Sequence, residues 1–374
     1  MSDQGPAGSL AGFEAAKAWI LEGVAAVAPV DLPLADAVGM VAGDAVFAAR
    51  AVPARDLAAL DGWALASGDL VGASAYAPAM LAPSPVRIEV GEPMPEGCDC
   101  VVEAEWVGAD GPFAEVTCEA IPGEGVRRAG DDIAEGARVL EPGRRVSAVD
   151  IACARALGLV TLPIRRPRLR LVDLACDGSL GLTTGLVSTR AVKAGAETVQ
   201  VSTERDAASI AAAMAGDFAD LVVVVGGTGA GGHDQTAAAL ARAGTLFAHG
   251  LALRPGRTAA IGRIGDTPVI ALPGQPDQAM AAWLALAEPL LARLSGARAR
   301  PAVARPLAHK ISSAIGMAEL VLLQQAADAW TPLSCGELPL GQLAAANAWC
   351  LVAAASEGDA AGTILSGSLL DEAP

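Results

Sequence analysis

The sequence predicts a multidomain α/β protein organised around a central, doubly wound and mostly parallel sheet. Between residues 168 and 297, strand patterns alternate with helix patterns, and the strands are continuous apolar runs such as LVVVV at 221–225. Such runs are typical of parallel strands that helices cover on both faces. The flanking stretches carry short β patterns and many turn residues, which indicates smaller units on either side of the sheet.

The N-terminal half predicts a helix, then a small β-rich unit, then a return to helix and strand. Phe13, Ala16 and Ile20 recur at helical spacing, so an amphipathic helix opens the chain. Residues 53–130 are rich in proline and glycine and contain three short strand patterns, VRIEV, DCVVEAEWV and FAEVTCEA. The stretch SAVDIACARALGLVTLPI predicts a helix followed by a strand, and RRPRLR leads into the sheet.

The sheet pattern begins with strand RLRLVDLAC, helix VSTRAVKAGA, strand ETVQVS and helix ERDAASIAAAMAG. It continues with strand DLVVVVGG, a helix from Asp234, strands TAAIGRI and TPVIALPG, and a last helix. Beyond residue 300, ELVLLQQA and AWCLVAAA are typical of a small β module. We therefore predict four domains: a discontinuous helical linker domain (1–50 with 135–166), a small β-rich domain (51–134), an α/β domain (167–298) and a C-terminal β domain (299–374).

The composition argues against several classes of function. The formal net charge of -16 disfavours binding to a nucleic-acid backbone, and an aromatic content of 3% leaves few stacking platforms for single strands. The seven cysteines are widely spaced without a CxxC pair, which argues against a disulfide framework or a zinc site. No secretory signal pattern is visible, and Glu288 and Pro289 interrupt the most apolar stretch well short of a membrane span. We expect a cytoplasmic protein that binds neither nucleic acid nor membranes.

The sequence LVVVVGGTGAGGHDQT ends a strand in glycines and leads into a helix. A P-loop would need a lysine after the glycines, and none follows. Gly227, Gly229 and Gly232 match the dinucleotide pattern GxGxxG, but the next strand carries no acidic residue for a ribose. A general anion site at a helix start remains, in which Gly226 and its neighbours let backbone N–H groups approach a phosphate. Asp234 could instead cap the helix, and the glycines could serve only a tight turn.

A second turn of this kind follows another strand in VIALPGQPDQAMAAW, where Pro273, Gly274 and Pro276 precede a helix. The carboxyl ends of parallel strands meet at one edge of a sheet, where the ligands of open α/β folds bind. Guanidinium groups suit phosphates and oxyanions. The stretch LALRPGRTAAIG adds two of them around a proline and a glycine: Arg254, Pro255, Gly256 and Arg257.

These turns resemble those of a known family. GGTGAGGHDQT, LALRPGRTAAIG and ALPGQPDQA, in this order, are similar to the turns of the molybdopterin molybdenumtransferases of the MoeA and gephyrin E-domain type. The similarity extends to ALDGWAL, GEPMPEGCDCVV and VRRAGDDIAEGARVLEPGRRV, and it covers most of residues 10–298. The resemblance implies that the α/β domain is MogA-like and binds molybdopterin.

The resemblance also implies an activity in molybdenum cofactor biosynthesis. Members of the family insert molybdate into adenylylated molybdopterin and release AMP, with Mg²⁺ as the expected cation. They are elongated homodimers whose active cleft lies between the sheet domain of one subunit and the β module of the other. The chemistry suits the residue types, because breaking a pyrophosphate link calls for oxygen ligands for Mg²⁺ and for positive groups near the phosphates.

Carried over onto this sequence, the resemblance implies that Asp61 and Asp132 are catalytic acids and, together with Asp234, metal ligands. Arg254 and Arg257 stand where the family has lysines and would be catalytic groups that clamp oxyanions. Asp61 and Asp132 could also be simple turn or loop residues. The pterin and phosphates would be bound by positions in the turns: Gly226, Gly227, Gly229, Gly232, Asp234, Pro255, Gly256, Pro273, Gly274 and Pro276.

The sequence also departs from the family pattern. DLACDGSL stands where the family has STGDEL, and the aspartate–serine/threonine–asparagine element that normally follows is missing, so Asp177 is the remaining acid. Glu96 replaces a threonine, and the glycine turn carries His233 but no serine. Three hypotheses stay open: an active molybdenum insertase, a non-catalytic carrier or chaperone of molybdopterin or of the finished cofactor for a molybdoenzyme, and a scaffold or nucleotide-using enzyme of another specificity.

Overall fold

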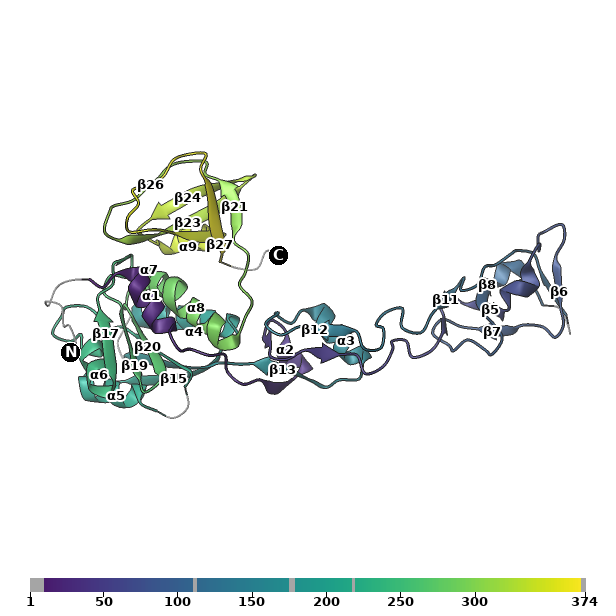
Figure 1. The fold of residues 1–374 in the computed structure, drawn as a ribbon, viewed down its shortest axis with the longest axis horizontal. Helices are drawn as coiled ribbons and strands as arrows, with labels where there is room; N and C mark the ends of the chain where they lie inside the picture. Colours follow the sequence, from purple (N-terminus) through teal and green to yellow (C-terminus); the bar gives the residue numbers. More distant parts are fainter. Residues whose placement is uncertain (1–9, 110–112, 175–178, 217–218, 371–374) are drawn as a thin grey trace.

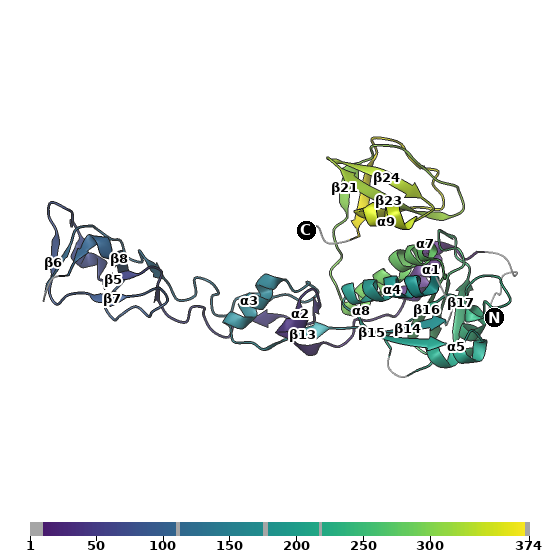
Figure 2. The same cartoon turned by 180° about the vertical axis from the view of Figure 1, so that it is seen from behind.

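The computed structural model describes residues 10–109, 113–174, 179–216 and 219–370, which form an elongated molecule (Figure 1). A sheet unit and a C-terminal β unit lie at one end (Figure 1). The chain extends from there through a linker unit to a small β-rich unit at the other end, as the view from behind also shows (Figure 2). Among the described residues, no helix combines the length and the apolar character needed to span a lipid bilayer.

The central sheet has six strands in the order β15-β14-β16-β20-β19-β17. Four of them are parallel: β15 (Glu197–Thr203), β14 (Arg168–Leu174), β16 (Leu221–Val225) and β20 (Thr267–Leu272). Two further strands continue the sheet in antiparallel pairing: β19 (Ala260–Ile264) and β17 (Thr245–His249). The predicted α/β fold with a mostly parallel sheet is confirmed. The sequence does not predict β17. In TLFAH three apolar residues stand in a row, so the alternating burial along the strand has no matching pattern in the sequence.

Helices cover both faces of this sheet. The first face carries α4 (Ser179–Lys193), α7 (Pro276–Ala282), the π-helical turn η3 (Trp283–Ala287), α8 (Glu288–Ser295) and α1 (Phe13–Leu21). The second face carries α5 (Ala207–Met214) and α6 (Thr236–Ala243). The start of α4 lies well before the predicted start at Val187, and α6 begins two residues after the predicted Asp234.

The burial of β16 on both faces of the sheet explains why its sequence is a continuous apolar run. Leu221, Val223 and Val225 belong to the core under the first helical face, whereas Val222 and Val224 belong to the core under the second. Successive side chains of a strand point to opposite faces, so a strand between two helical layers needs an apolar residue at every position. The sheet is therefore doubly wound, as predicted.

The linker unit combines two separate stretches of chain around one small core, which includes Leu140, Leu162 and Ile164. Ser147 caps its main helix, because its hydroxyl accepts a hydrogen bond from the Asp150 N–H while the Asp150 carboxylate accepts one from the Ser147 N–H. The elements of this unit are β1 (Val30–Pro33), α2 (Leu34–Ala37), β2 (Val41–Ala42), β3 (Val46–Phe47), β12 (Arg138–Leu140), α3 (Ala148–Ala156) and β13 (Thr161–Arg165).

The small β-rich unit consists of short strands, as its proline and glycine content predicts. Its three-stranded sheet has the order β7-β5-β8, and a second has the order β6-β10-β9. The elements are β4 (Leu57–Ala58), β5 (Gly62–Leu65), η1 (Ser67–Leu70), β6 (Ala79–Leu81), β7 (Val86–Ile88), β8 (Cys100–Glu103), η2 (Ala104–Trp106), β9 (Val107–Gly108), β10 (Ala114–Val116) and β11 (Val126–Arg127).

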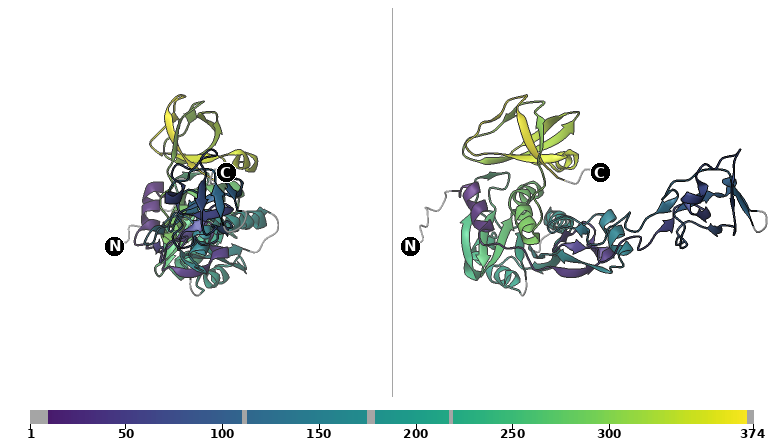
Figure 3. Two further views of the ribbon diagram at one scale, coloured as in Figure 1. Left: turned by 90° about the vertical axis from the view of Figure 1, so that its right-hand side faces the viewer. Right: turned by 45° about the vertical axis from the view of Figure 1, so that its right-hand side comes forward.

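The C-terminal unit is a sheet of order β18-β23-β25-β27-β21, with β24 paired to β23. It lies over the helices of the sheet unit (Figure 3). Its elements are β18 (Leu253–Arg254), β21 (Val303–Pro306), β22 (Ile311–Ser312), β23 (Ala318–Ala326), β24 (Ala329–Cys335), α9 (Leu340–Ala345), β25 (Ala348–Val352), β26 (Gly358–Asp359) and β27 (Ile364–Leu369).

The C-terminal unit shares structure with the sheet unit. The strand β18 comes from the stretch predicted as α/β domain, yet it pairs with β23. Ala318, Leu320 and Leu322 of β23 are buried in the same core as the helices on the first face of the sheet. The two units are therefore joined by a strand and a common core, and the four predicted domain boundaries stay predictions.

Candidate functional site

The two glycine turns lie side by side at the carboxyl edge of the sheet. The strands before them, β16 and β20, are parallel neighbours with Val225 opposite Leu272. Directly beyond this pair, the Gly226 N–H donates a hydrogen bond to the Leu272 carbonyl oxygen at 2.9 Å. The loop that carries Gly229 and the turn at Gly274 therefore share one sheet edge, where ligands of open α/β folds bind.

The first turn requires glycine for two reasons. Gly226 and Gly227 have φ angles of 95° and 65°, in the left-handed region that favours glycine. A Cβ on Gly227 would lie 2.5 Å from Thr236 Oγ1 and 2.7 Å from Leu174 Cδ1. Thr236 begins α6, and its hydroxyl donates to the Gly226 carbonyl oxygen at 2.8 Å. The turn is thus held directly against the start of the helix.

Asp234 closes the loop that follows this turn. Its carboxylate accepts a hydrogen bond from the Gly231 N–H at 2.8 Å, and its own N–H donates to the Gly231 carbonyl oxygen at 2.9 Å. A Cβ on Gly229 would come within 2.6 Å of this carboxylate, so glycine is favoured there as well. Asp234 does not cap α6, since the N-cap is Gln235 and makes no side-chain capping bond.

The neighbouring positions Gly232 and His233 are less constrained. A Cβ on Gly232 would meet open space, and its φ is not among the positive ones. His233 is exposed. The structure therefore gives a reason for glycine at positions 226, 227 and 229, but none at position 232.

A third loop, at 253–258, contacts the first turn and the helix that follows the second turn. The hydroxyl of buried Thr228 in the first turn lies 3.3 Å from the hydroxyl of Thr258. At Gly256, where φ is 113°, a Cβ would lie 3.2 Å from the Gln278 carbonyl oxygen in α7, the helix that follows the second turn. Pro255 is buried between these contacts. Loops 226–234, 253–258 and 273–276 therefore lie together at this edge of the sheet, and we call them the three-loop site.

The second turn is braced by α4. Pro276 occupies the first turn of α7, where its fixed φ suits a helix start. The carbonyl oxygen of Gly274, next to Pro273, accepts a hydrogen bond from the Thr183 hydroxyl at 2.8 Å. The next hydroxyl, of Thr184, donates to the Asp173 carboxylate of β14 at 2.8 Å.

Sequence reasoning missed several polar residues in or beside the three-loop site. Thr183 and Thr184 are buried, and their signal was a pair of adjacent hydroxyl residues shortly after a sheet strand. Thr228 is the polar residue inside the glycine turn, and a ring nitrogen of His249 lies 2.8 Å from its carbonyl oxygen. His249 ends the unpredicted strand β17, so nothing in the sequence pattern pointed to it.

The two arginines of the third loop have different surroundings. Arg257 is exposed, and within the described part of the chain no hydrogen bond or ion pair of its guanidinium is found. Arg254, with 51% of its side chain exposed, forms an ion pair with Glu319 of the C-terminal unit, in which Nη1 lies 3.0 Å from Oε1. The pairing of β18 with β23 places Arg254 opposite Glu319, and its expected role in clamping an oxyanion stays a prediction.

Glu319 is well suited to hold Arg254. Its side chain is 4% exposed, and its second oxygen accepts a hydrogen bond from the Cys335 thiol at 3.3 Å. Burial alone would raise the pKa of Glu319, but the Cys335 hydrogen bond and the Arg254 charge outweigh it and leave the pKa below its ordinary value. Burial and the nearby carboxylate raise the pKa of Cys335 to about 12, so the thiol stays protonated and can donate.

Replacing Glu319 by glutamine is expected to lower the free energy of unfolding at pH 7 by about 2 kcal/mol, because a buried charged pair loses one charge. The folded-state pKa of Glu319 lies below its ordinary value of 4.5, so the pair stabilises the protein above that value. This contribution is lost as the pH falls through the folded-state pKa. Urea unfolding of wild type and Glu319→Gln from pH 7 to pH 3 should show a difference that shrinks at acid pH. A constant difference, or an equal effect of the exposed control Glu357→Gln, would contradict the pairing.

The two other acidic candidates lie in the β-rich unit. Asp61 precedes β5, and its Oδ1 accepts a hydrogen bond from the Val90 N–H at 2.7 Å. The glycine that follows is required by close packing, since a Cβ on Gly62 would lie 2.2 Å from the Val102 carbonyl oxygen. Asp132 forms an ion pair with Arg127.

Within one chain, the three aspartates expected to bind Mg²⁺ do not come together. Asp61 and Asp132 belong to the β-rich unit and Asp234 to the sheet unit, at opposite ends of the molecule (Figures 1 and 2). In the ranges that the structure describes, no group of three or more His, Cys, Asp or Glu side chains could hold a metal ion. These residues could share a metal only if the β-rich unit of a second chain approached. Asp177 lies outside the described residues, and Glu96 is exposed on the β-rich unit.

Two family models match the chain in the order of its units. One, described as "MoeA N-terminal region (domain I and II)", matches residues 12–158, and the other, described as "Probable molybdopterin binding domain", matches residues 183–293. The chain belongs to the MoeA-type family. In this MoeA-type chain the first match spans the linker and β-rich units, and the second spans the three-loop site.

Known proteins agree with the assignment. This MoeA-type chain is 29% identical over 317 residues to "Molybdopterin molybdenumtransferase 2" of Mycobacterium tuberculosis, a match that covers 74% of this chain and 78% of the relative. It is 27% identical over 296 residues to "Molybdopterin molybdenumtransferase" of Haemophilus influenzae, covering 71% and 72%. The solved structure of the "molybdopterin biosynthesis moeA protein from Pyrococcus horikoshii OT3" has the same fold, with a TM-score of 0.75 at 22% identity over 96% of this chain and 100% of that one.

Proposed function

We propose that this chain is a molybdopterin molybdenumtransferase, which acts in molybdenum cofactor biosynthesis by inserting molybdate into adenylylated molybdopterin and releasing AMP. The observation that carries the proposal is the meeting of three loops at one carboxyl edge of the sheet. Membership of the MoeA-type family and the names of the relatives supply the substrate class.

The residues of the three-loop site suit a phosphorylated ligand. Gly226 and Gly227 allow close approach to the backbone, and the Thr228–Thr258 contact holds the first and third loops together. The exposed guanidinium of Arg257 is always charged and presents several donors to an oxyanion. When the pyrophosphate link breaks, an oxygen of water or of molybdate forms a new bond to one phosphorus. The bridging oxygen leaves with the electron pair of the broken P–O bond and stays on the other phosphate. Preorganised donors stabilise the negative charge that develops in this step.

We further propose that the complete site lies between two chains of a homodimer. Asp61 and Asp132 would come from the β-rich unit of one chain, and the three loops and Asp234 from the other. The elongated shape supports this arrangement, because the β-rich unit lies far from the three loops of its own chain (Figure 3). Carboxylate oxygens from the two chains would then be available to Mg²⁺, which prefers oxygen ligands.

The test is the release of AMP by the purified protein. With adenylylated molybdopterin, molybdate and Mg²⁺, we expect one AMP for each molybdopterin consumed. Addition of EDTA should stop the release, and excess Mg²⁺ should restore it. Release that persists at full rate in EDTA would contradict the role of the cation, and the absence of any release from a protein that binds the substrate would contradict the transferase.

A second candidate is a non-catalytic carrier or chaperone that binds molybdopterin or the finished cofactor for a molybdoenzyme. One observation favours it: Arg254, expected to clamp an oxyanion, is bound to Glu319 instead. The two candidates predict different outcomes of the same assay. Binding of molybdopterin without Mg²⁺-dependent AMP release would support the carrier, and turnover would exclude it.

A further inference from the structure

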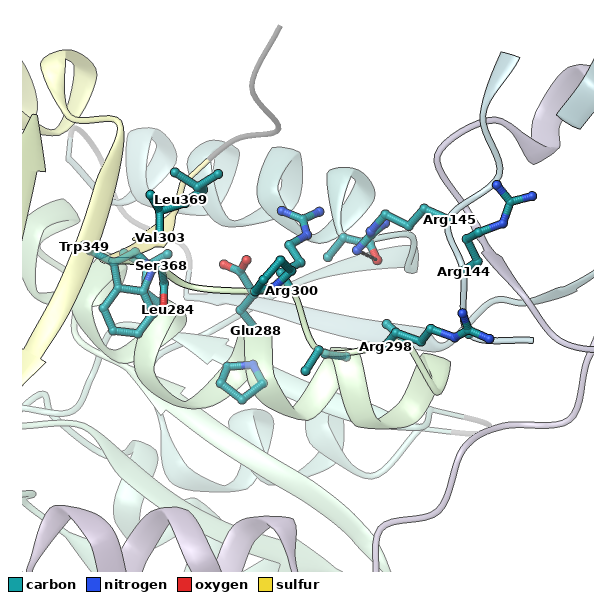
Figure 4. A pocket seen from close by; sticks show the side chains of 17 residues that line it. Arg144, Arg145, Leu284, Glu288, Arg298, Arg300, Val303, Trp349, Ser368 and Leu369 are labelled. Atoms are coloured by element: carbon teal, nitrogen blue, oxygen red, sulfur yellow. Dashed lines mark hydrogen bonds between the residues drawn. The ribbon is translucent and has the colours of Figure 1, made fainter. Parts of the chain in front are cut away.

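A cavity of about 710 Å³ lies where the sheet unit, the linker unit and the C-terminal unit meet (Figure 4). Its walls come from η3 and α8, from the linker loop at 143–145, from the connecting segment at 297–301, and from the strands of the C-terminal unit. No residue of the three-loop site lines it. Small-molecule pockets commonly measure roughly 300–1,000 Å³, so the cavity has the right size for such a ligand.

The two ends of this junction cavity differ in chemistry. One end is apolar, with the indole of Trp349 beside Leu284 and Leu369 (Figure 4). The other end carries the guanidinium groups of Arg144, Arg145 and Arg298 (Figure 4). A ligand that fills the cavity would therefore have an apolar body at one end and a negative group at the other.

The positive charge of the cavity stands out in an acidic protein. The chain has a net charge of -16, yet four arginines and only one carboxylate, Glu288, line the cavity. Local charge of this kind attracts anions even when the whole protein is negative.

Contacts outside the cavity hold the arginines in position. Arg298 pairs with Glu141 at 2.5 Å, and Arg144 pairs with Asp150. Arg145 donates to the Gly39 carbonyl oxygen at 2.7 Å. Arg144 also donates to the Val139 carbonyl oxygen at 3.2 Å, and Arg145 to the Ala194 carbonyl oxygen at 3.5 Å. A guanidinium has five N–H donors, so such contacts leave donors for a ligand. The Arg144 and Arg298 side chains are 41% and 57% exposed, which keeps them accessible.

We propose that the junction cavity binds a small molecule of the nucleotide class, with a flat ring against Trp349 and phosphate groups against Arg144, Arg145 and Arg298. Aromatic rings pack favourably on an indole, and guanidinium groups bind phosphates through paired N–H donors. This site is additional to the three-loop site and does not depend on the proposed transferase activity. A ligand there would bridge three units of the chain, so its binding should stabilise their arrangement.

ADP is the probe for this proposal, with binding measured by isothermal titration calorimetry on the full chain. We expect Arg298→Gln and Trp349→Leu each to weaken ADP binding by about tenfold or more. The control Arg242→Gln, at an exposed arginine of α6, should leave the affinity unchanged. Adenosine and pyrophosphate, which each carry one half of the ligand, should both bind more weakly than ADP.

Three outcomes would overturn the proposal. They are no binding of ADP, unchanged affinity in both cavity variants, and pyrophosphate binding as tight as that of ADP. Circular dichroism will show whether Trp349→Leu is folded, and Arg298→Gln, at an exposed side chain, carries the test if it is not. The variant Asp234→Ala, at the three-loop site, should still bind ADP at the cavity. Loss of AMP release with intact ADP binding therefore concerns the transferase proposal alone, and loss of ADP binding concerns the cavity alone.

Discussion

The variant Asp61→Asn is expected to release AMP from adenylylated molybdopterin about 100-fold more slowly than the wild type. The reason is the loss of one negative charge that the β-rich unit is proposed to supply to the active site. Asparagine retains a side-chain oxygen that can accept the hydrogen bond from the Val90 N–H, at 2.7 Å in the wild type. The fold should therefore be unaffected, with Tm within about 1 °C of the wild type, as is usual for surface substitutions. Initial rates of AMP release and a thermal melt measure the two effects separately.

Asp69→Asn is the matched control for this variant. Asp69 is an exposed acid of the same unit, in η1, and it lies outside the proposed site. It should keep the wild-type rate. An undiminished rate for Asp61→Asn, or an equal loss for Asp69→Asn, would remove Asp61 from the proposed site.

Mixing two inactive variants tests whether the site lies between chains. Asp61→Asn disables the β-rich unit and Asp234→Ala disables the three-loop site, so each homodimer alone should be inactive. After subunit exchange, half of the dimers contain one chain of each kind, and each such dimer has one intact site of two. About a quarter of the wild-type activity should return in a symmetric dimer. If the mixed chains exchange subunits and no AMP-release activity returns, Asp61 and Asp234 do not share a site between two chains.

The variant Gly227→Ala is expected to lower the free energy of unfolding by about 3 kcal/mol. Two costs add up at this position. The φ of 65° is unfavourable for any residue with a Cβ, and the new methyl group would lie 2.5 Å from Thr236 Oγ1 and 2.7 Å from Leu174 Cδ1. Both neighbours are buried, so they have little room to move. Urea unfolding at pH 7 measures the loss, and AMP release should fall with it.

Two other glycines separate these costs. Gly265 has a φ of 59° with nothing within 4 Å of a Cβ, so Gly265→Ala should cost only the backbone term of about 1 kcal/mol. Gly232 has neither a positive φ nor a close neighbour, so Gly232→Ala should change stability by less than about 0.5 kcal/mol. If Gly227→Ala proved no more destabilising than Gly265→Ala, the first turn would be looser than described.

Much of the fold could be predicted because a buried strand or helix needs apolar side chains at regular positions of the sequence. The run Leu221–Val225 needs an apolar side chain at every position, since helices cover both faces of the sheet. The glycines at 226 and 227 mark a backbone that only glycine adopts easily. The strand β17 escaped prediction because it lies at the edge of the sheet and most of its side chains are exposed.

The candidate site was only partly predictable. The two turns and the third loop were identified as neighbours because parallel strands end at the same edge. The partner of Arg254 could not be identified from the sequence, because Glu319 belongs to another unit of the chain. The pairing of β18 with β23 brings the two residues together. The role of Asp234 was also ambiguous, since a helix cap and a loop closure call for the same side chain.

The sequence by itself determined the order of strands and helices, the positions of the turns and the family, because these depend on residues that are close together in the chain. Only the tertiary structure decided which distant side chains meet. It pairs Arg254 with Glu319, sets Thr228 against Thr258 and gathers arginines from the linker loop and the connecting segment around the junction cavity. It also separates Asp61 from Asp234 within one chain. The physical reason is that such contacts depend on the order and register of strands and on the packing of whole units, which no local pattern specifies.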